Sequence, residues 1–513
     1  MDRRALTAAL SGAAVALTGA LTGISTLGTA QAAEPGSPLV LDAPDRVVAR
    51  SHDGRVYSNL GVRMTAQGEA FELRAHRPTY DDAIETYWHR EGLEPLALPE
   101  GSMTTWQGVD DFTTIRILQD GKRVKRLHSL GCFNGEAQKV GPDGPASNPY
   151  PWGCPWNPYT LGSVMGVAED YSASLLPDWG TNLRLEPGVY ELVAVIEPQW
   201  RQFFGISRAD GKTSTRLVVR KARDRWRSVE PATAARGVDE LEPTLRAPTA
   251  EAEGEMVNEF APDLRALPAF DISLNEKGTA LRFGATVWNG GHGPMVIEGF
   301  REDHDHVEDG GDHTDHMTAY QYFFDGDGQQ TGYEQVGEFG YHAANHDHWH
   351  FEDFARYRLF SPDPENPDQP GKLAVRSTKA SFCLVATDAV DYTVPNADWR
   401  PEYTDLSSQC GGRRAQSLRQ VLSNGSGDTY HQYRAGQAFR IGDLPDGRYF
   451  IGIQANPDDR DGRNLSELDY TNNDSYREVE IGTNKRTGRR WVRSAQVGII
   501  EELMSDFFFR SRS

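Results

Sequence analysis

Three histidines, His346, His348 and His350, alternate with other residues along a short stretch of the chain. Successive side chains of a β-strand point to opposite faces, so the three imidazoles share one face if this stretch is a strand. Trp349 and Phe351 then lie on the other face, as apolar packing. Imidazole is a ligand for Cu, Zn, Fe and Ni alike, so the triplet predicts a metal site without choosing the metal.

A second set of candidate metal ligands lies in segment 303–316, where most residues are aspartate, glutamate or histidine. Tracts of this composition can bind metal ions. The segment could therefore collect copper or zinc before delivery to the histidine triplet. A solvated acidic loop is the alternative interpretation, and the residues alone leave both open.

The elements that position these residues are predicted to be β-strands in two folded domains. A chain of 513 residues is longer than one hydrophobic core usually serves. Residues 37–221 and 259–483 both show short alternating apolar runs broken by Gly, Pro and Asp, which predicts an all-β fold of two sandwich-like domains. Residues 222–258 lack a strand pattern and are expected to be a linker. The tail, 484–513, begins basic and ends apolar, and we expect it to pack as a terminal helix.

The second domain has a recognisable series of strand candidates, because apolar residues alternate over short runs and helical periods are few. These candidates are Ala280–Val287, Met295–Phe300, Ala319–Phe324, Ala355–Phe360, Ser381–Ala386, Gln437–Ile441, Tyr449–Ala455 and Tyr476–Ile481.

The first 32 residues predict an export signal. Arg3 and Arg4 form a basic start, residues 13–29 an apolar run, and residues 30–32 (Ala-Gln-Ala) a small-residue cleavage site. The arginine pair leaves open whether export is general or twin-arginine. A membrane anchor is the alternative, but Gly and Thr interrupt the short apolar run. We therefore expect a secreted protein.

Composition narrows the partners and the redox environment. The formal net charge of −21 argues against a nucleic-acid partner, which requires basic patches, and favours cationic substrates by electrostatic steering. No membrane partner is indicated. Four cysteines in an exported chain predict two disulfides. The pairs Cys132–Cys154 and Cys383–Cys410 are the simplest of the three possible connectivities.

An aromatic and proline-rich loop, residues 148–156, lies inside the first domain. It could bind a ligand such as a sugar or cell-wall material. An aromatic plug held by a disulfide is the alternative that the sequence favours.

The residues around the histidine triplet resemble the copper-binding segment of the lysyl oxidase family, which includes positions corresponding to Asp353 and Tyr357. Four further segments are similar to motifs of that family and occur in the same order. They are residues 261–265 (Ala-Pro-Asp-Leu-Arg), 378–384 (Thr-Lys-Ala-Ser-Phe-Cys-Leu), 428–430 (Asp-Thr-Tyr) and 466–473 (Ser-Glu-Leu-Asp-Tyr-Thr-Asn-Asn). The resemblance spans about 260–483 and has no counterpart in the N-terminal half.

The resemblance implies a lysyl-oxidase-like β-sandwich with Cu²⁺ on His346, His348 and His350. It also implies a lysyl tyrosylquinone cofactor made by joining Lys379 to Tyr430. Such an enzyme deaminates primary amines, either peptidyl lysine or small amines, to aldehydes, consuming O₂ and releasing H₂O₂ and ammonia. The cofactor supplies the difficult chemistry and the protein supplies orientation and a base.

The catalytic base stays unassigned at this point. Asp353 is a candidate because it follows the histidines, and the sequence does not separate it from Glu352 or Asp347.

A structural Ca²⁺ site is also implied, because hard oxygen donors suit this ion. Its ligands would be the side chains of Asp263, Glu467, Asp469, Asn472 and Asn473, with the backbone carbonyl of Leu264. A turn capped by Asp and Asn side chains is the alternative.

The chain departs from animal members of the family at two places near the histidines. Ala344 and Asn345 stand where those members have a cysteine, and His342 is one place out of register with their additional histidine. Two other functions therefore stay in view. One is a zinc hydrolase that uses three histidines and an activated water, and the other is a non-catalytic metal-binding or wall-binding protein on the same fold.

Overall fold

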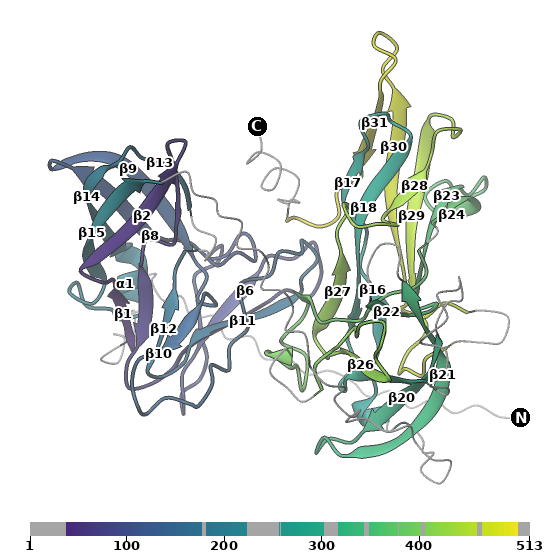
Figure 1. The fold of residues 1–513 in the computed structure, drawn as a ribbon, viewed down its shortest axis with the longest axis horizontal. Helices are drawn as coiled ribbons and strands as arrows, with labels where there is room; N and C mark the ends of the chain where they lie inside the picture. Colours follow the sequence, from purple (N-terminus) through teal and green to yellow (C-terminus); the bar gives the residue numbers. More distant parts are fainter. Residues whose placement is uncertain are drawn as a thin grey trace, which may run out of the picture.

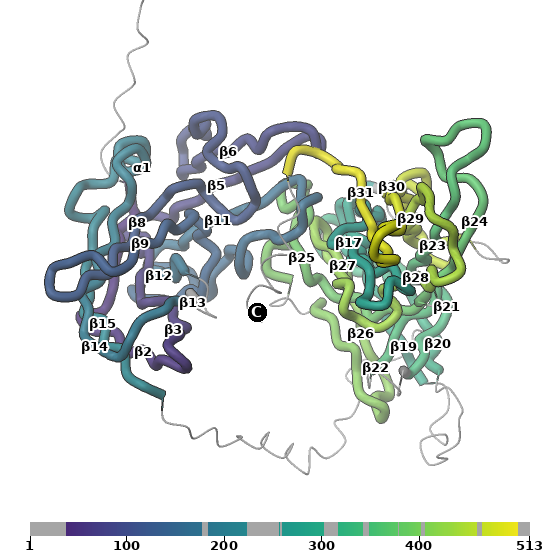
Figure 2. The backbone as a smooth tube through the Cα atoms, turned by 90° about the horizontal axis from the view of Figure 1, so that it is seen from above, coloured from purple at the N-terminus to yellow at the C-terminus, as the bar shows by residue number. Residues whose placement is uncertain are grey.

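The computed structural model describes residues 37–176, 181–222, 256, 258–301, 316–342, 348–377, 379–401, 406–458 and 464–500. These form an N-terminal and a C-terminal part, each built almost wholly from β-strands, which lie side by side in Figures 1 and 2. The all-β prediction is therefore confirmed. The export signal, nearly all of the linker, the body of segment 303–316 and His346 lie outside the described residues.

The N-terminal part contains three sheets. Two have four strands, in the orders β1-β4-β12-β10 and β11-β5-β6-β7, and the third has seven, in the order β13-β3-β2-β15-β14-β8-β9. The strands are β1 (Leu39–Asp42), β2 (Arg46–His52), β3 (Arg55–Ser58), β4 (Arg63–Ala66), β5 (Phe71–His76), β6 (Glu85–His89), β7 (Leu96–Ala97), β8 (Val109–Gln119), β9 (Lys122–Gly131), β10 (Ala137–Lys139), β11 (Gly162–Val167), β12 (Tyr171–Ser174), β13 (Thr181–Arg184), β14 (Gly188–Ile196) and β15 (Lys212–Lys221).

Aromatic side chains fill the core of this part. Phe71, Phe133 and Phe204 are fully buried, and the ring centroid of Phe71 lies 4.9 Å from that of Phe133 and 5.1 Å from that of Phe204. Phe204 follows the short helix α1 (Pro198–Phe203), which begins at a proline because the fixed φ of that residue suits the first helical position.

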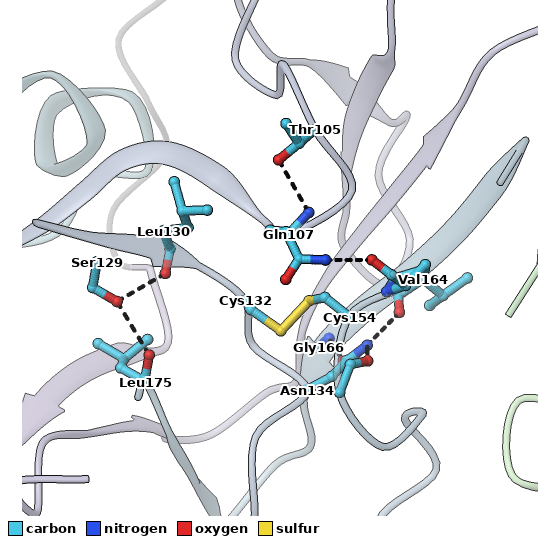
Figure 3. The surroundings of a disulfide bond; sticks show 12 residues. Thr105, Gln107, Ser129, Leu130, Cys132, Asn134, Cys154, Val164, Gly166 and Leu175 are labelled. Carbon is cyan, nitrogen blue, oxygen red and sulfur yellow. Dashed lines mark hydrogen bonds between the residues drawn. A yellow bond between two sulfur atoms is a disulfide. The ribbon is translucent and has the colours of Figure 1, made fainter. Parts of the chain in front are cut away.

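The disulfide Cys132–Cys154 joins β9 to the aromatic loop, as predicted (Figure 3). Asn134 secures the same region, since its amide donates to the Val164 carbonyl at 2.8 Å and its carbonyl accepts from the Gly166 amide at 3.0 Å. Tyr150 of the loop is buried, whereas Trp152 is 64% exposed. The plug interpretation therefore holds for one half of the loop only.

The C-terminal part also contains three sheets. The first runs β16-β18-β27-β25, with β17 and β28 also paired to β18; the second runs β22-β21-β20-β19-β26, and the third β24-β23-β29-β30-β31. The elements are η2 (Asn258–Phe260), β16 (Leu264–Ala266), β17 (Phe270–Leu274), β18 (Ala280–Asn289), β19 (Met295–Phe300), β20 (His316–Phe324), β21 (Gln330–His342), β22 (His348–Phe351), β23 (Ala355–Pro362), β24 (Pro370–Arg376), β25 (Asp388–Ala389), β26 (Ser417–Leu422), β27 (Ser426–Tyr430), β28 (Ala438–Arg440), β29 (Gly447–Ala455), β30 (Asp474–Thr483) and β31 (Arg490–Ser494).

Two sequence expectations for this part were wrong. Residues 381–386 form isolated bridges, Phe351↔Phe382 and Val385↔Val421, because this segment passes between β22 and β26 instead of joining one sheet. The described part of the tail, residues 484–500, forms β31, which pairs antiparallel with β30, where a terminal helix was expected; residues 501–513 lie outside the described residues, and for them the helix stays a prediction. Most other strand candidates fall within observed strands, and Met295–Phe300 coincides with β19.

The two parts share an interface. Arg477 donates to the Tyr159 hydroxyl and, at 2.8 Å, to the Ala269 carbonyl. The Leu161 amide donates to the Val390 carbonyl at 2.7 Å, just after β25. Apolar side chains from both parts form one buried cluster around these contacts. The N-terminal part therefore packs against the sheet that contains β25 and β27. No helix among the described residues is long and apolar enough to cross a membrane.

Candidate functional site

Lys379 and Tyr430 are 51 positions apart in the sequence and adjacent in the structure. The Lys379 Nζ lies 4.4 Å from the centroid of the Tyr430 ring and 4.6 Å from that of Phe382. Tyr430 is the last residue of β27, and Lys379 follows β24. The fold therefore brings together the two residues that the sequence predicted to be joined.

Local backbone contacts hold Lys379 in this place. Its amide donates to the Ser377 hydroxyl at 3.1 Å, and that hydroxyl donates to the Gly436 carbonyl at 2.9 Å. Gly436 has a φ of 84°, and a Cβ there would lie 2.8 Å from the Lys379 Cβ. A glycine is needed both for the left-handed conformation and for the close approach.

Tyr430 is held by a hydrogen bond and by ring packing. Its hydroxyl donates to the Cys383 carbonyl at 3.1 Å, and its ring meets Phe382 edge-on at 5.1 Å. Burial, together with the nearby Asp428 carboxylate, raises the pKa of the phenol well above its usual value. Tyr430 therefore stays a neutral phenol at ordinary pH. The disulfide Cys383–Cys410, also as predicted, anchors the segment that positions it.

Asp428 is a functional candidate that the sequence reasoning missed. It lies two positions before Tyr430 on β27, so both side chains point to the same face. Asp428 is only 4% exposed, and its Oδ2 has no hydrogen-bond partner among the described residues. Burial raises the pKa of this carboxyl well above its usual value, opposed by the charge of Lys379. The Asp-Thr-Tyr motif could have pointed to Asp428, because residues two positions apart in a strand share one face.

The surroundings of Lys379 favour the neutral form of its amine. Burial lowers the pKa of its amine to about 8, against the opposing influence of Asp428, while Arg434 lowers it further. A lysine with such a pKa has a large fraction of nucleophilic amine at mildly alkaline pH, unlike an exposed lysine.

The described histidines lie on a strand that contacts the segment directly after Lys379. β22 contains His348 and His350, whose ring centroids are 4.9 Å apart, while Trp349 is fully buried on the other face, as alternation predicted. His350 is buried and its Nδ1 lies 3.4 Å from the Ser381 hydroxyl. The Phe351 amide donates to the Phe382 carbonyl at 2.7 Å, so β22 is hydrogen-bonded to the segment that follows Lys379.

Two neighbouring imidazoles on one strand are suitable nitrogen ligands for a transition-metal ion such as copper. No group of three His, Cys, Asp or Glu side chains able to hold a metal occurs within the described ranges. The third histidine of the predicted triplet, His346, is not in those ranges.

The structure describes two of the base candidates from the sequence, Asp353 and Glu352, and neither is as buried as Asp428. The Asp353 side chain is 42% exposed and its Oδ1 lies 3.2 Å from the Arg356 guanidinium. Glu352 is partly buried just after β22, and Asp347 is outside the described residues.

The predicted calcium ligands converge in part. Glu467 is buried and accepts hydrogen bonds from the Leu264 amide at 2.6 Å and from the Asn473 side chain at 2.7 Å. Burial raises its pKa to about 7. Asp263 is buried and lies 2.6 Å from the Arg265 guanidinium and 3.1 Å from the Asn472 amide nitrogen.

Two side-chain amide oxygens among the predicted calcium ligands are buried without a hydrogen bond within the part of the chain that the structure describes. Asn472 Oδ1 and Asn473 Oδ1 are buried and have no hydrogen-bond partner among the described residues. Oxygens of this kind beside two carboxylates fit a hard cation. Asp469, by contrast, accepts from the Thr471 amide at 2.8 Å and hydroxyl at 2.7 Å, which matches the capped-turn alternative.

The other face of β27 belongs to the domain interface. Thr429 points away from Asp428, and its hydroxyl lies 2.7 Å from that of Thr286 and donates to Asp388 at 3.2 Å. Asn157 of the N-terminal part donates to Thr286 at 3.0 Å. Burial raises the pKa of Asp388 to about 7, opposed by hydrogen bonds from Asn157 and Thr429. The N-terminal part thus supports the strand that carries Asp428 and Tyr430.

Asp388→Asn is expected to change how stability depends on pH. The folded pKa of Asp388 is raised, so its carboxyl stays protonated in the folded protein while it ionises in the unfolded chain above pH about 4. Its contribution is therefore complete below pH 4 and is lost as pH rises through 7. We expect the difference in free energy of unfolding, variant minus wild type, to increase by about 1–3 kcal/mol between about pH 4 and pH 7. This range allows for the partial solvation of the Asp388 side chain.

Urea unfolding at pH 4, 5.5, 7 and 8 measures this difference. The exposed Asp443→Asn is the matched control and should track the wild type. A constant difference between Asp388→Asn and wild type across this range would contradict the interpretation.

Comparison with known families matches part of the chain. The model of the lysyl oxidase family matches residues 326–487. That interval contains His348, His350, Lys379, Asp428 and Tyr430, together with the Glu467–Asn473 segment. The search of curated proteins finds no match to the chain.

Proposed function

We propose, from the premise that residues 326–487 form a domain of the lysyl oxidase family, that the chain is a secreted, copper-dependent amine oxidase. It would convert primary amines, either peptidyl lysine or small amines, to aldehydes, with O₂ as oxidant and H₂O₂ and ammonia as products. The observation that supports this most is the Lys379 Nζ, 4.4 Å from the centroid of the Tyr430 ring. A structural role alone does not require a lysine over a buried phenol.

The cofactor would arise from these two side chains. A bond forms between the Lys379 nitrogen and a carbon of the Tyr430 ring. The joined pair gains one oxygen atom from O₂ and loses four hydrogens, which leave as water and H₂O₂ through the reduction of two O₂ molecules. The lowered pKa of Lys379, about 8, supplies the neutral amine that this bond requires.

His346, His348 and His350 would hold the Cu²⁺, which supplies the one-electron redox chemistry for oxidising Tyr430. The lysyl tyrosylquinone would supply the carbonyl chemistry for amine oxidation. The buried setting of His350 and the pairing of β22 with the segment after Lys379 keep the histidines and the pair of residues in one place.

Asp428 is the base that we propose for turnover. Its Oδ2 would accept the proton from the substrate carbon next to nitrogen, because it shares the face of β27 with Tyr430 and has no other hydrogen-bond partner among the described residues. A carboxyl with a raised pKa binds a proton more readily than an exposed one, which suits a group that takes and then releases it.

A structural Ca²⁺ is the second ion that we propose. Asp263, Glu467, Asn472, Asn473 and the Leu264 carbonyl would be its main ligands, with Asp469 at the edge. The buried amide oxygens of Asn472 and Asn473 support this assignment. The ion would tie β16, the first strand of the C-terminal part, to the segment before β30.

The test is a peptide mass map of the full chain purified without metal and then supplied with Cu²⁺ in air. We expect the Lys379 and Tyr430 peptides to appear joined, with one oxygen gained and four hydrogens lost, and phenylhydrazine to give a coloured adduct. Zn²⁺ in place of Cu²⁺ is the control and should leave both peptides separate.

Two results would contradict this proposal and indicate another function. Unmodified peptides with bound copper would indicate a non-catalytic metal-binding protein. Hydrolytic activity that requires Zn²⁺, with no amine-dependent release of H₂O₂, would indicate a hydrolase.

A further inference from the structure

The outer face of the seven-stranded sheet in the N-terminal part carries an unusual density of arginine for a chain of net charge −21. Four arginines lie on the adjacent strands β2 and β15, where Arg46 is directly opposite Arg216 and Arg50 is directly opposite Arg220. All four are exposed. We call these four residues the central arginine rows.

Alternation explains why the charges share one face. Ala49 of β2, and Leu217 and Val219 of β15, point inwards and are buried, so the residues between them must point outwards. The same holds towards the edges of the sheet, where Arg116 of β8 pairs with Arg126 of β9. Arg184 of β13 likewise pairs with Arg55 of β3. The sheet therefore presents four cross-strand arginine pairs on one side.

These arrangements work against the stability of the isolated fold. Like charges directly opposite each other on neighbouring strands destabilise a sheet. Among the described residues none of these eight arginines makes an ion pair with a carboxylate, although Glu191 lies opposite Arg216. A polyanion bound to the face would remove the repulsion.

The face is also open and partly apolar. Val48 and Val189 are each 48% exposed and Tyr57 is 50% exposed, all among the arginines. In Figures 1 and 2 the strands β14, β15 and β2 lie on the side of the N-terminal part away from the C-terminal part, whereas β6 and β11 lie towards it. Binding at this face would therefore leave the candidate active site free.

We propose that this face binds an extended polymer, other than a nucleic acid, whose repeating units carry phosphate. Within each central row the arginines are four residues apart, about 13 Å along the strand, and adjacent rows are about 5 Å apart. A grid of this size suits a linear chain with many charges better than a compact ligand. All eight basic groups in these pairs are guanidinium groups. A guanidinium binds phosphate through two parallel hydrogen bonds, whereas lysine acts as a point charge.

The proposal does not depend on amine oxidation. The average charge of the chain argues against a polyanionic partner, but an average over 513 residues does not reveal one locally basic face. Counter-ion release makes the affinity for a polyanion fall as salt rises. The slope of log affinity against log salt is roughly proportional to the number of phosphates contacted.

The test measures binding of the full chain to fluorescently labelled long-chain inorganic polyphosphate by anisotropy, over a series of NaCl concentrations. The variant Arg46→Gln/Arg50→Gln/Arg216→Gln/Arg220→Gln is expected to bind at least tenfold more weakly. Its slope of log affinity against log salt should be smaller by about three, as expected for four lost phosphate contacts. If this variant does not fold, Arg50→Gln/Arg220→Gln should give about half of the change in slope.

The matched control removes four exposed basic groups from the C-terminal part, Arg440→Gln/Lys485→Gln/Arg486→Gln/Arg489→Gln. It should bind polyphosphate as the wild type does, and both variants should still form the Lys379–Tyr430 cross-link. That readout separates failure of this proposal from failure of the proposed function.

Three results would overturn the inference. They are no polyphosphate binding by the wild type at low salt, equal weakening in the control variant, and tighter binding to duplex DNA or to phosphatidylglycerol vesicles than to polyphosphate. The last would indicate a nucleic-acid or membrane surface instead.

Discussion

Tyr430→Phe is expected to abolish both the cross-link to Lys379 and the oxidation of amines. A phenylalanine ring lacks the oxygen from which the quinone is built, so the pair stays unlinked. The fold should survive, because the ring keeps its edge-on contact with Phe382. The variant loses one hydrogen bond, from the hydroxyl to the Cys383 carbonyl, worth about 1 kcal/mol.

Amine-dependent release of H₂O₂ by copper-loaded protein measures this effect, with the peptide mass map run in parallel. We expect the rate to fall to that of buffer with free copper. Tyr433→Phe is the matched control, since Tyr433 is close in sequence but 67% exposed, and it should keep the cross-link and the activity. Residual turnover in Tyr430→Phe would show that the oxidant is not built from this residue.

Asp428→Asn is expected to keep the cross-link and lose turnover. Removing a positioned base slows proton transfer by about 10²–10⁴-fold, so kcat should fall by that order while KM changes little. The acidic limb of the pH–rate profile should disappear with the carboxylate. Steady-state kinetics on fully cross-linked protein measure both effects.

The same substitution has a second readout at Lys379. Because the Asp428 charge raises the pKa of Lys379 against the effect of burial, its removal lowers that pKa further. The pH at which cross-linking becomes fast should therefore shift downwards from about 8. A purely structural role for Asp428 would not produce this shift.

Asp353→Asn distinguishes the two candidate bases. Asp353 pairs with Arg356 and its side chain is 42% exposed, so we expect its loss to change kcat only a few-fold. A larger loss in Asp353→Asn than in Asp428→Asn would reassign the base.

Local periodicity explains the parts of the fold and site that were predicted correctly. Alternation placed Trp349 opposite His348 and His350, and a short apolar run located the strand Met295–Phe300, because both signals depend on neighbouring residues only. Residues 381–386 carry an equally apolar pattern and are not a strand. Their backbone meets two different sheets, and no short-range pattern encodes which neighbours a segment will meet.

The sequence by itself determined the all-β class, the two disulfide pairs as the simplest connectivity, and the alternating faces of the histidine strand. Only the tertiary structure decided that the Lys379 amine lies over the Tyr430 ring and that Asp428 is buried beside both. It also decided that arginines from separate strands meet in opposed pairs on one sheet face. The physical reason is range: alternation is a property of one strand, whereas these contacts require the pairing and register of strands far apart in the chain.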